Sequence, residues 1–325
     1  MKMRTSPWRA AVAALLTAAS GAALVPATAQ AAAPLVKTQA PGYYRVMLGD
    51  FEVTALSDGT VELPVDKLLT NIKPAALEKA LTRAYLKAPV ETSVNAFLIN
   101  TGSKLVLVDT GAGTLYGPTL GKLVSNLKEA GYQPEQVDAV LITHMHPDHI
   151  GGLMAGDQRT FPNATVHVDK ADVDYWLSAD NMTKAPAEMQ GMFQGATAML
   201  TPYVKADKLK PFTGDTELVP GIKAMGAHGH TPGHSTYAVE SKGQKLVLWG
   251  DLLHVASVQF ADPSVTIQFD SDSKAAAAQR KKAFADAAKQ GYWVGAAHVS
   301  FPGIGHVTPE GKGYEYFPAN YSTKQ

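Results

Sequence analysis

Three histidines and an aspartate lie within six residues of the segment THMHPDHIGG, directly after the apolar run VDAVLI. Core packing gives no reason to place four strongly solvated groups at the end of a buried strand. Histidine and carboxylate side chains suit a borderline divalent cation such as zinc, and sites of this kind without cysteine are usually catalytic. His144 and His146 project the same way from an extended chain, whereas Pro147 favours a helix start that turns Asp148 and His149 toward a second ion. The alternative is a solvated polar turn.

Further candidate ligands follow other predicted strands. The loop GAHGHTPGHS carries three histidines, the run LVLWGD ends in Asp251, and VGAAH ends in His298. His306, which lies beyond a Pro/Gly turn, competes with His298 for the last position, and His167 sits inside a strand-like segment where a structural role is expected. The concentration of histidine and aspartate at strand ends predicts a metal centre. The candidates in the loop are His228, His230 and His234.

In this order of motifs the chain resembles the metallo-β-lactamase superfamily over essentially all of its length after residue 31. The resemblance implies a fold of class α/β (α+β), an αβ/βα sandwich of two mixed β-sheets flanked by helices. It implies two divalent ions, Zn²⁺ first, with Mn²⁺, Co²⁺ or Fe²⁺ as alternatives. One ion would be held by His144, His146 and His234, the other by Asp148, His149 and His298, with Asp251 bridging them. His228 and His230 would orient their loop or hydrogen-bond the ligands, with direct contact to an ion as the alternative, and Asp109 in LVLVDTG would fix a loop beside the ligands.

Two adjacent cations lower the pKa of a bridging water enough to supply hydroxide at neutral pH, and one of them polarises the substrate oxygen. No nucleophilic serine or cysteine is then needed, and the GxSxG pattern is absent. Asp148 and Asp251 are the expected catalytic residues, which position the attacking group and move its proton. The chain is therefore predicted to be a metal-dependent hydrolase.

Within the superfamily the chain is most similar to the methyl parathion hydrolases and their lactonase relatives. Segments such as TGSKLVLVDTGAG and SFPGIGH carry this likeness. The resemblance implies an aromatic entrance suited to flat aryl substrates, formed by Tyr116, Trp176 and Phe193. The chain departs from the phosphotriesterase pattern at four further positions expected to contact substrate, which are Leu68, His254, Ile267 and Phe269.

These departures leave less room beside the ions for a tetrahedral phosphotriester, so the predicted substrates are aryl lactones of the dihydrocoumarin type and aryl esters. The alternatives are an organophosphate triesterase with the same ligands and an acyl-homoserine lactonase with a long apolar channel. A non-enzymatic metal-binding protein is disfavoured, because such proteins typically lose ligands.

The elements that must position these groups follow from hydrophobic patterning. Apolar runs bounded by Gly or Asp predict strands, and helices are expected between them over residues 119–130, 170–178 and 273–290. Interleaved strands and helices indicate a layered α/β or α+β domain. The Met-rich segment 186–206 is weakly patterned, and we expect a surface helix pair, an inserted lid or a dimer contact there.

Composition bounds the remaining possibilities. Basic residues precede an apolar run and small residues in the first part of the chain, which predicts a signal peptide over 1–31, export to the periplasm, and a hydrolase domain over 32–325. The chain has no cysteine, so disulfides cannot stabilise it. With 29 basic and 29 acidic residues it lacks the charge expected of a nucleic-acid or anionic-membrane binder. A small-molecule substrate is expected, and the family resemblance implies a homodimer.

Overall fold

The computed structural model describes residues 33–323, so the predicted signal peptide lies outside the described residues. Of the described residues, those from Ala40 onward form one compact unit, and residues 33–39, which lie outside it, contain no helix or strand. Among the described residues, no helix combines the length and apolar character that crossing a membrane requires.

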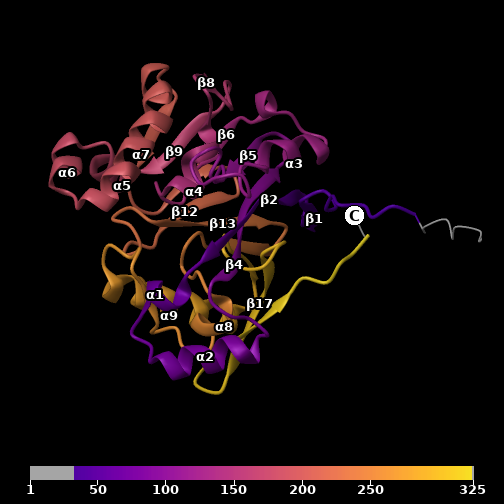
Figure 1. The fold of residues 1–325 in the computed structure, drawn as a ribbon. Helices are drawn as coiled ribbons and strands as arrows, with labels where there is room; N and C mark the ends of the chain where they lie inside the picture. Colours follow the sequence, from indigo (N-terminus) through magenta and orange to yellow (C-terminus); the bar gives the residue numbers. More distant parts are fainter. Residues whose placement is uncertain (1–32, 324–325) are drawn as a thin grey trace, which may run out of the picture. The chain divides into compact units, whose positions relative to one another are not determined.

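Two seven-stranded sheets organise the Ala40–Gln325 unit (Figure 1). Both sheets are mixed, with parallel pairing at β5–β6–β9–β10 in the first and at β14–β16 in the second. In spatial order the first contains β1 (Tyr43–Leu48), β2 (Phe51–Leu63), β4 (Val90–Asn100), β5 (Leu105–Val108), β6 (Ala139–Leu141), β9 (Thr165–Asp169) and β10 (Leu209–Phe212). The second contains β11 (Thr216–Val219), β12 (Ile222–Gly226), β13 (Ser235–Ser241), β14 (Gln244–Leu248), β16 (Trp293–Gly295), β17 (Ile304–Glu310) and β18 (Gly313–Pro318).

Helices cover the outer faces of both sheets, so each sheet is buried on two sides. The helices are α1 (Val65–Leu68), α2 (Pro74–Arg83), α3 (Leu123–Glu129), α4 (Pro147–Ile150), α5 (Lys170–Trp176), α6 (Ala179–Lys184), α7 (Ala187–Lys205), α8 (Ala256–Gln259) and α9 (Ser273–Gln290). Two 3₁₀ turns, η1 (Pro134–Gln136) and η2 (Gly151–Leu153), and two small ribbons, β3 (Leu69–Thr70) with β15 (Thr266–Ile267) and β7 (Met154–Ala155) with β8 (Gln158–Arg159), complete the unit.

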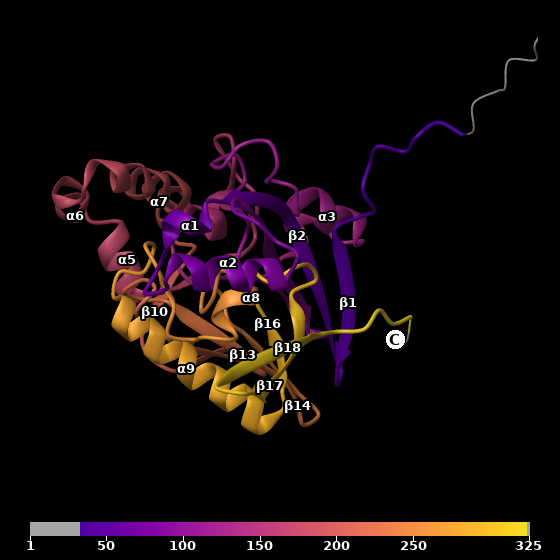
Figure 2. The ribbon, with the colours of Figure 1, turned by 60° about the horizontal axis from the view of Figure 1, so that its bottom comes forward.

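Three buried apolar clusters hold these layers together. Between the sheets, Phe97 and Val106 of the first pack with Tyr237 and Leu248 of the second. On the outer face of the first sheet lie α3, α5 and α7, and α9 covers the second sheet through Phe284 (Figure 2). The predicted sandwich of two mixed sheets flanked by helices is confirmed.

Local signals explain where individual helices begin and end. Asp272 accepts a hydrogen bond from the backbone N–H of Ala275 at the start of α9, and Gly291 ends the helix in the left-handed conformation with φ 70°. The predicted helix over 119–130 is shorter than expected and spans Leu123–Glu129 as α3. The Met-rich segment forms the single helix α7, which buries Phe193 and Leu200, so the expected pair of surface helices is wrong.

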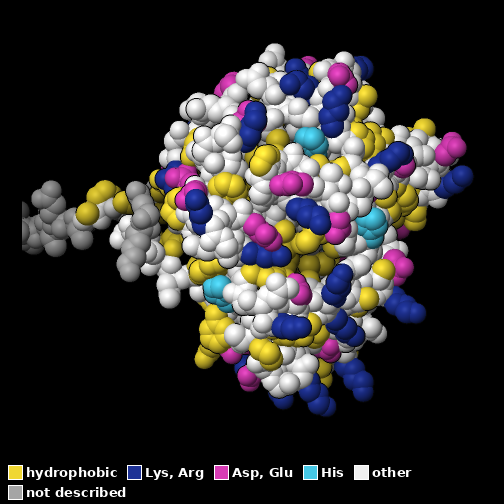
Figure 3. All heavy atoms as spheres, turned by 180° about the vertical axis from the view of Figure 1, so that it is seen from behind, with side chains coloured by type: hydrophobic (Ala, Val, Ile, Leu, Met, Phe, Trp, Pro, Cys, Tyr) yellow, Lys and Arg dark blue, Asp and Glu magenta, His cyan; other side chains and the backbone are white. Residues whose placement is uncertain are grey.

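Basic and acidic side chains are interspersed over the face of the molecule seen in Figure 3, with several Lys and Arg side chains near its lower edge. This mixture agrees with the formal net charge of zero.

Candidate metal centre

The HxHxDH segment follows strand β6 and turns into α4 at Pro147, as predicted. Its three histidines are buried, and Asp148 is only partly exposed. The loop is tied to its surroundings by Asp109, which accepts hydrogen bonds from the backbone N–H and the hydroxyl of Thr143 at 2.8 Å each. The chain therefore holds the three histidines in the interior and leaves only Asp148 partly open to solvent.

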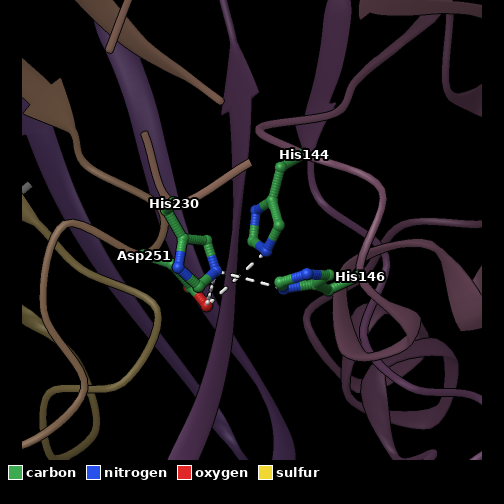
Figure 4. A group of neighbouring side chains, drawn as sticks. All are labelled: His144, His146, His230 and Asp251. Atoms are coloured by element: carbon green, nitrogen blue, oxygen red, sulfur yellow. Dashed lines mark hydrogen bonds and ion pairs between the residues drawn. The ribbon is translucent and has the colours of Figure 1, made fainter. Parts of the chain in front are cut away.

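A first group of four side chains meets at the edge between the two sheets (Figure 4). One nitrogen or oxygen of each lies within 4.8 Å of the others. Asp251 Oδ2 is 3.6 Å from His144 Nε2 and 3.3 Å from His230 Nε2, and His230 Nε2 is 3.1 Å from His146 Nδ1. Three imidazoles and one carboxylate thus surround a single point.

A second group shares Asp251 with the first and adds Asp148, His149 and His298. The Nε2 atoms of His149 and His298 lie 3.2 and 3.1 Å from Asp251 Oδ1. They also lie 3.5 and 3.4 Å from Asp148 Oδ2. Because the two oxygens of Asp251 face different groups, this one carboxylate can bridge two ions.

His230 occupies the place in the first group that the sequence analysis assigned to His234. Both nitrogens of His234 are engaged elsewhere: Nδ1 lies 3.2 Å from the carbonyl oxygen of Ala227, and Nε2 accepts a hydrogen bond from the backbone N–H of Asp251 at 3.0 Å. The assignment is corrected accordingly: His234 braces the loop and His230 faces the point where an ion would sit.

The remaining histidines lie outside both groups. The half-exposed His228 is 3.4 Å from Asp169, and the ring of His306 on β17 lies tilted against Trp293 with ring centres 3.9 Å apart. His167 lies within β9, as expected for a structural residue. Of the two histidines that competed for the last position, the structure brings His298 into the second group.

Burial and neighbouring charged side chains shift the pKa values of several residues in the two groups. Burial by itself raises the pKa of Asp251, but His149, His298 and His144 together hold that pKa well below its usual value. Burial and the adjacent His149 lower the pKa of His144 well below its usual value. Burial lowers the pKa of His230 as well, but Asp251 and Asp270 outweigh it and raise the pKa to about 9. The carboxylates therefore stay ionised and attract positive charge to this point.

Several ligand atoms are buried and have no hydrogen-bond partner within residues 33–323. They are His144 Nε2, His149 Nε2 and Asp251 Oδ1. A buried polar atom without a partner costs about 1–3 kcal/mol, and a bound cation would remove that cost for all three. The donor set, imidazole and carboxylate without thiolate, is the one that catalytic divalent cations prefer. The residues present therefore fit two divalent ions.

Neighbouring groups orient the imidazoles. Asp109 Oδ2 is 2.8 Å from His149 Nδ1, the carbonyl oxygen of Ser93 is 2.9 Å from His298 Nδ1, and Asp270 Oδ1 is 2.9 Å from His230 Nδ1. In each case the nitrogen on the far side, Nε2, is directed at Asp251. The loop-fixing role expected for Asp109 agrees with this geometry, whereas no local pattern in the sequence pointed to Asp270.

A cavity of about 300 Å³ opens onto both groups. Four of the seven predicted substrate-contacting residues line it: Leu68, Tyr116, His254 and Phe269. Tyr116 lies at the mouth and is 42 % exposed. His254 stacks on His298 with ring centres 5.2 Å apart, and its Nε2 lies 3.0 Å from Asp251 Oδ2. Val61, Leu63, Pro64 and Met192 also line the cavity and were not predicted.

Trp176, Phe193 and Ile267 do not reach this cavity. Trp176 and Phe193 are buried between α5 and α7 with ring centres 4.7 Å apart, and Ile267 is buried in another apolar cluster. Trp176 contacts a candidate ligand instead, because its ring packs edge-on against the ring of His146 with ring centres 5.4 Å apart. The predicted aromatic entrance is thus reduced to Tyr116, with Phe269 in the cavity wall.

Comparisons with known proteins agree with this geometry. The sequence profile of the metallo-beta-lactamase superfamily matches residues 89–303. The crystal structure of the hydrolase AbOPH in the beta lactamase superfamily is 39 % identical, covers 88 % of this chain and all of its own, and superposes with a TM-score of 0.84. AidC, a dizinc quorum-quenching lactonase solved with the product N-hexnoyl-L-homoserine, is 26 % identical with a TM-score of 0.81, covering 87 % of this chain and 99 % of its own. The N-acyl homoserine lactonase of Bacillus cereus is 26 % identical over 57 % of this chain and 74 % of its own length.

Proposed function

Because this chain belongs to the metallo-beta-lactamase superfamily, we propose that it is a metal-dependent hydrolase that opens aryl lactones and aryl esters beside two adjacent divalent cations. The observation that carries the proposal is the pair of side-chain groups that share Asp251, with unpartnered buried ligand atoms in both. A pair of cations can activate water directly, and among the described residues none that lines the cavity next to Asp251 is a serine or cysteine.

One ion would be held by His144, His146 and His230, the other by Asp148, His149 and His298, with Asp251 between them. Zinc is the first candidate, because imidazole and carboxylate ligands suit it and because AidC is a dizinc lactonase. When bound, such a pair of cations lowers the pKa of water and stabilises the negative charge that develops on the substrate oxygen.

Asp148 and Asp251 are the proposed catalytic residues of the chain. Asp251 is buried among histidines, which favours its ionised form and fixes both of its oxygens. The side chain of Asp148 is 18 % exposed and lines the cavity, so its free oxygen can take a proton from the attacking group and pass it to the leaving oxygen. His254, 3.0 Å from Asp251, restricts the room beside these groups.

The shape of the cavity supports a small, flat, apolar substrate. Leu68, Met192 and Phe269 supply apolar walls, and Tyr116 supplies an aromatic ring at the mouth. About 300 Å³ accommodates a bicyclic aryl lactone such as dihydrocoumarin. The likeness to N-acyl homoserine lactonases supports a second candidate substrate, an acyl-homoserine lactone with a short acyl chain.

Parallel assays of the zinc-reconstituted protein test the proposal. We expect faster turnover of dihydrocoumarin than of methyl paraoxon, and a rate on acyl-homoserine lactones that falls as the acyl chain outgrows the cavity. Asp148→Asn should lower kcat on dihydrocoumarin by at least about 100-fold, while Asp157→Asn, at an exposed turn, should leave it unchanged. Faster turnover of methyl paraoxon, or full activity of Asp148→Asn, would contradict the proposal.

Export to the periplasm and homodimer formation stay predictions of the sequence. Mass spectrometry of the secreted chain tests a new N-terminus near residue 31, and light scattering of the purified protein tests the dimer.

A further inference from the structure

Asp270 is a fully buried carboxylate between β15 and α9, on the side of His230 that faces away from Asp251. Its Oδ1 lies 2.9 Å from Nδ1 of His230. Its Oδ2 accepts a hydrogen bond from the backbone N–H of Ile267 at 3.2 Å. Both oxygens are therefore engaged as acceptors, and one of them faces an imidazole whose opposite nitrogen points at Asp251.

An ionised carboxylate only accepts hydrogen bonds, so the proton of this contact belongs to Nδ1 of His230. With Nδ1 protonated, a neutral imidazole carries its lone pair on Nε2. That lone pair is directed at the point where His144, His146 and Asp251 converge (Figure 4). Asp270 thus selects the one tautomer of His230 that can bind a cation there.

Arg280 on α9 places a positive charge beside Asp270. Its side chain is fully buried, and Nη2 lies 4.0 Å from Asp270 Oδ2. Its Nε donates to the carbonyl oxygen of Leu252, and Nη1 donates to that of Val265 at 2.6 Å. Because Leu252 follows Asp251 directly, one guanidinium hydrogen-bonds the backbone beside Asp251 and faces the carboxylate behind His230 with its positive charge.

Backbone hydrogen bonds join the loop of His230 to the segment that follows Asp270, so the two residues keep a fixed relative position. The N–H groups of Ser271 and Asp272 donate to the carbonyl oxygens of His230 and Gly229 at 2.9 and 2.8 Å. Gly229 has φ 143°, and a Cβ there would lie 2.4 Å from the backbone nitrogen of Ala276. Only glycine allows the loop to seat this closely on the start of α9.

We propose that Asp270 is a positioning residue for His230, kept ionised beside the charge of Arg280, and that it tunes the affinity of one cation of the pair. The inference rests on the proposed metal centre. Removing a carboxylate that orients a metal-binding histidine typically costs about 10- to 100-fold in metal affinity. The effect should be confined to the ion at His144, His146 and His230, because Asp270 contacts no residue that belongs only to the other group.

Asp109 provides a matched control on the other side of the centre. It is also buried, and its Oδ2 lies 2.8 Å from Nδ1 of His149, which belongs only to the second group. Asp270→Asn and Asp109→Asn therefore make the same chemical change behind one histidine of each group. A merely structural role would weaken both ions alike, because it would act through the stability of the whole unit.

The test is to equilibrate each variant over a range of free Zn²⁺ and to measure the occupancy of each ion by anomalous diffraction. For Asp270→Asn we expect the affinity of the ion at His144, His146 and His230 to fall about 10- to 100-fold, with the other ion unchanged. Asp109→Asn should weaken the other ion more, with a smaller loss at the first, because Asp109 also accepts from Thr143, whose hydroxyl lies 3.1 Å from Nδ1 of His144. Unchanged affinities in Asp270→Asn, or equal losses at both ions, would overturn the inference.

Arg280→Lys keeps a positive charge near Asp270 but cannot donate to both carbonyl oxygens. It should weaken the same ion as Asp270→Asn, by a smaller factor. If Asp270→Asn fails to fold, Arg280→Lys tests the inference in its place, and equal losses at both ions would then overturn it. A parent protein that binds no zinc would refute the proposed function itself, whereas a parent with two ions and an unaffected Asp270→Asn would refute only this inference.

Discussion

Asp172 on α5 allows a quantitative test of how the two ligand-bearing loops are joined. Its Oδ2 accepts hydrogen bonds from the backbone N–H of Met145 at 2.9 Å and from the hydroxyl of Thr231 at 3.0 Å, and its Oδ1 accepts from the N–H of Gly233 at 2.6 Å. This one buried carboxylate therefore bonds the loop after β6 to the loop before β13.

Burial raises the pKa of Asp172 from 3.8 to about 6, although the three donors oppose the increase. Below pH 3.8 the carboxyl is protonated in both the folded and the unfolded chain. As the pH rises toward 6, the unfolded chain loses this proton first, so the free energy of unfolding decreases. A tenfold change in proton affinity is worth about 1.4 kcal/mol, so the whole decrease is about 3 kcal/mol.

The perturbation is Asp172→Asn, assayed by urea unfolding of the metal-free parent and variant between pH 4.5 and pH 8. Asparagine presents an N–H group to one of the three donors, which lowers the free energy of unfolding by a fixed amount at every pH. It also removes the penalty of burying a charge, which grows by about 2 kcal/mol over this range. The destabilisation by Asp172→Asn should therefore shrink by about 2 kcal/mol from pH 4.5 to pH 8. A destabilisation that stays constant or grows with pH would refute the reasoning.

Three further outcomes are expected. Arg280→Met leaves buried carbonyl oxygens and Asp270 without their cation, so the free energy of unfolding measured in urea should fall by about 3–5 kcal/mol; a loss under about 1 kcal/mol would contradict this. Trp176→Ala should lower the free energy of unfolding by about 3–5 kcal/mol, because the ring packs in the core and does not line the cavity entrance. A variant of unchanged stability with an altered KM would instead place the ring at the entrance. Phe269→Ala opens the cavity wall and should raise KM for dihydrocoumarin about 10-fold, whereas an unchanged KM would remove the ring from the substrate site.

The architecture was predictable because its signals are local. Apolar strand runs with turn residues at their ends predicted strands of a layered domain, whereas the two-sheet sandwich was implied by the family resemblance. The helix α9 spans residues 273–290 as expected because Asp272 caps its start and Gly291 ends it. The side chains of the HxHxDH segment were predictable for the same reason, since alternate residues of an extended chain point one way and Pro147 begins a helix.

The choice between His230 and His234 was not decidable from local pattern. Both lie in one loop, four residues apart. Which of them turns inward depends on the path allowed by Gly229 and on Asp270, a partner 40 residues away in the sequence. The structure resolves the choice because it shows Nε2 of His234 already bonded to the backbone of Asp251.

The aromatic rings of α5 and α7 were misplaced for a different reason. The family resemblance implied an aryl-binding surface, but a resemblance does not say which face of a helix meets the core. Trp176 of α5 and Phe193 of α7 pack on each other between these two helices. Met192, the residue beside Phe193, reaches the cavity instead. Substrate contacts depend on such tertiary packing, so they were the least predictable part of the site.

The central claim, that two side-chain groups joined by Asp251 bind two cations and thereby enable hydrolysis, is tested most directly by counting ions. The purified chain, stripped with a chelator and titrated with Zn²⁺, should bind two ions per chain as activity on dihydrocoumarin returns, and Asp251→Ala should lose both properties. A chain that binds no zinc, or that hydrolyses the lactone equally well after complete metal removal, would contradict the account.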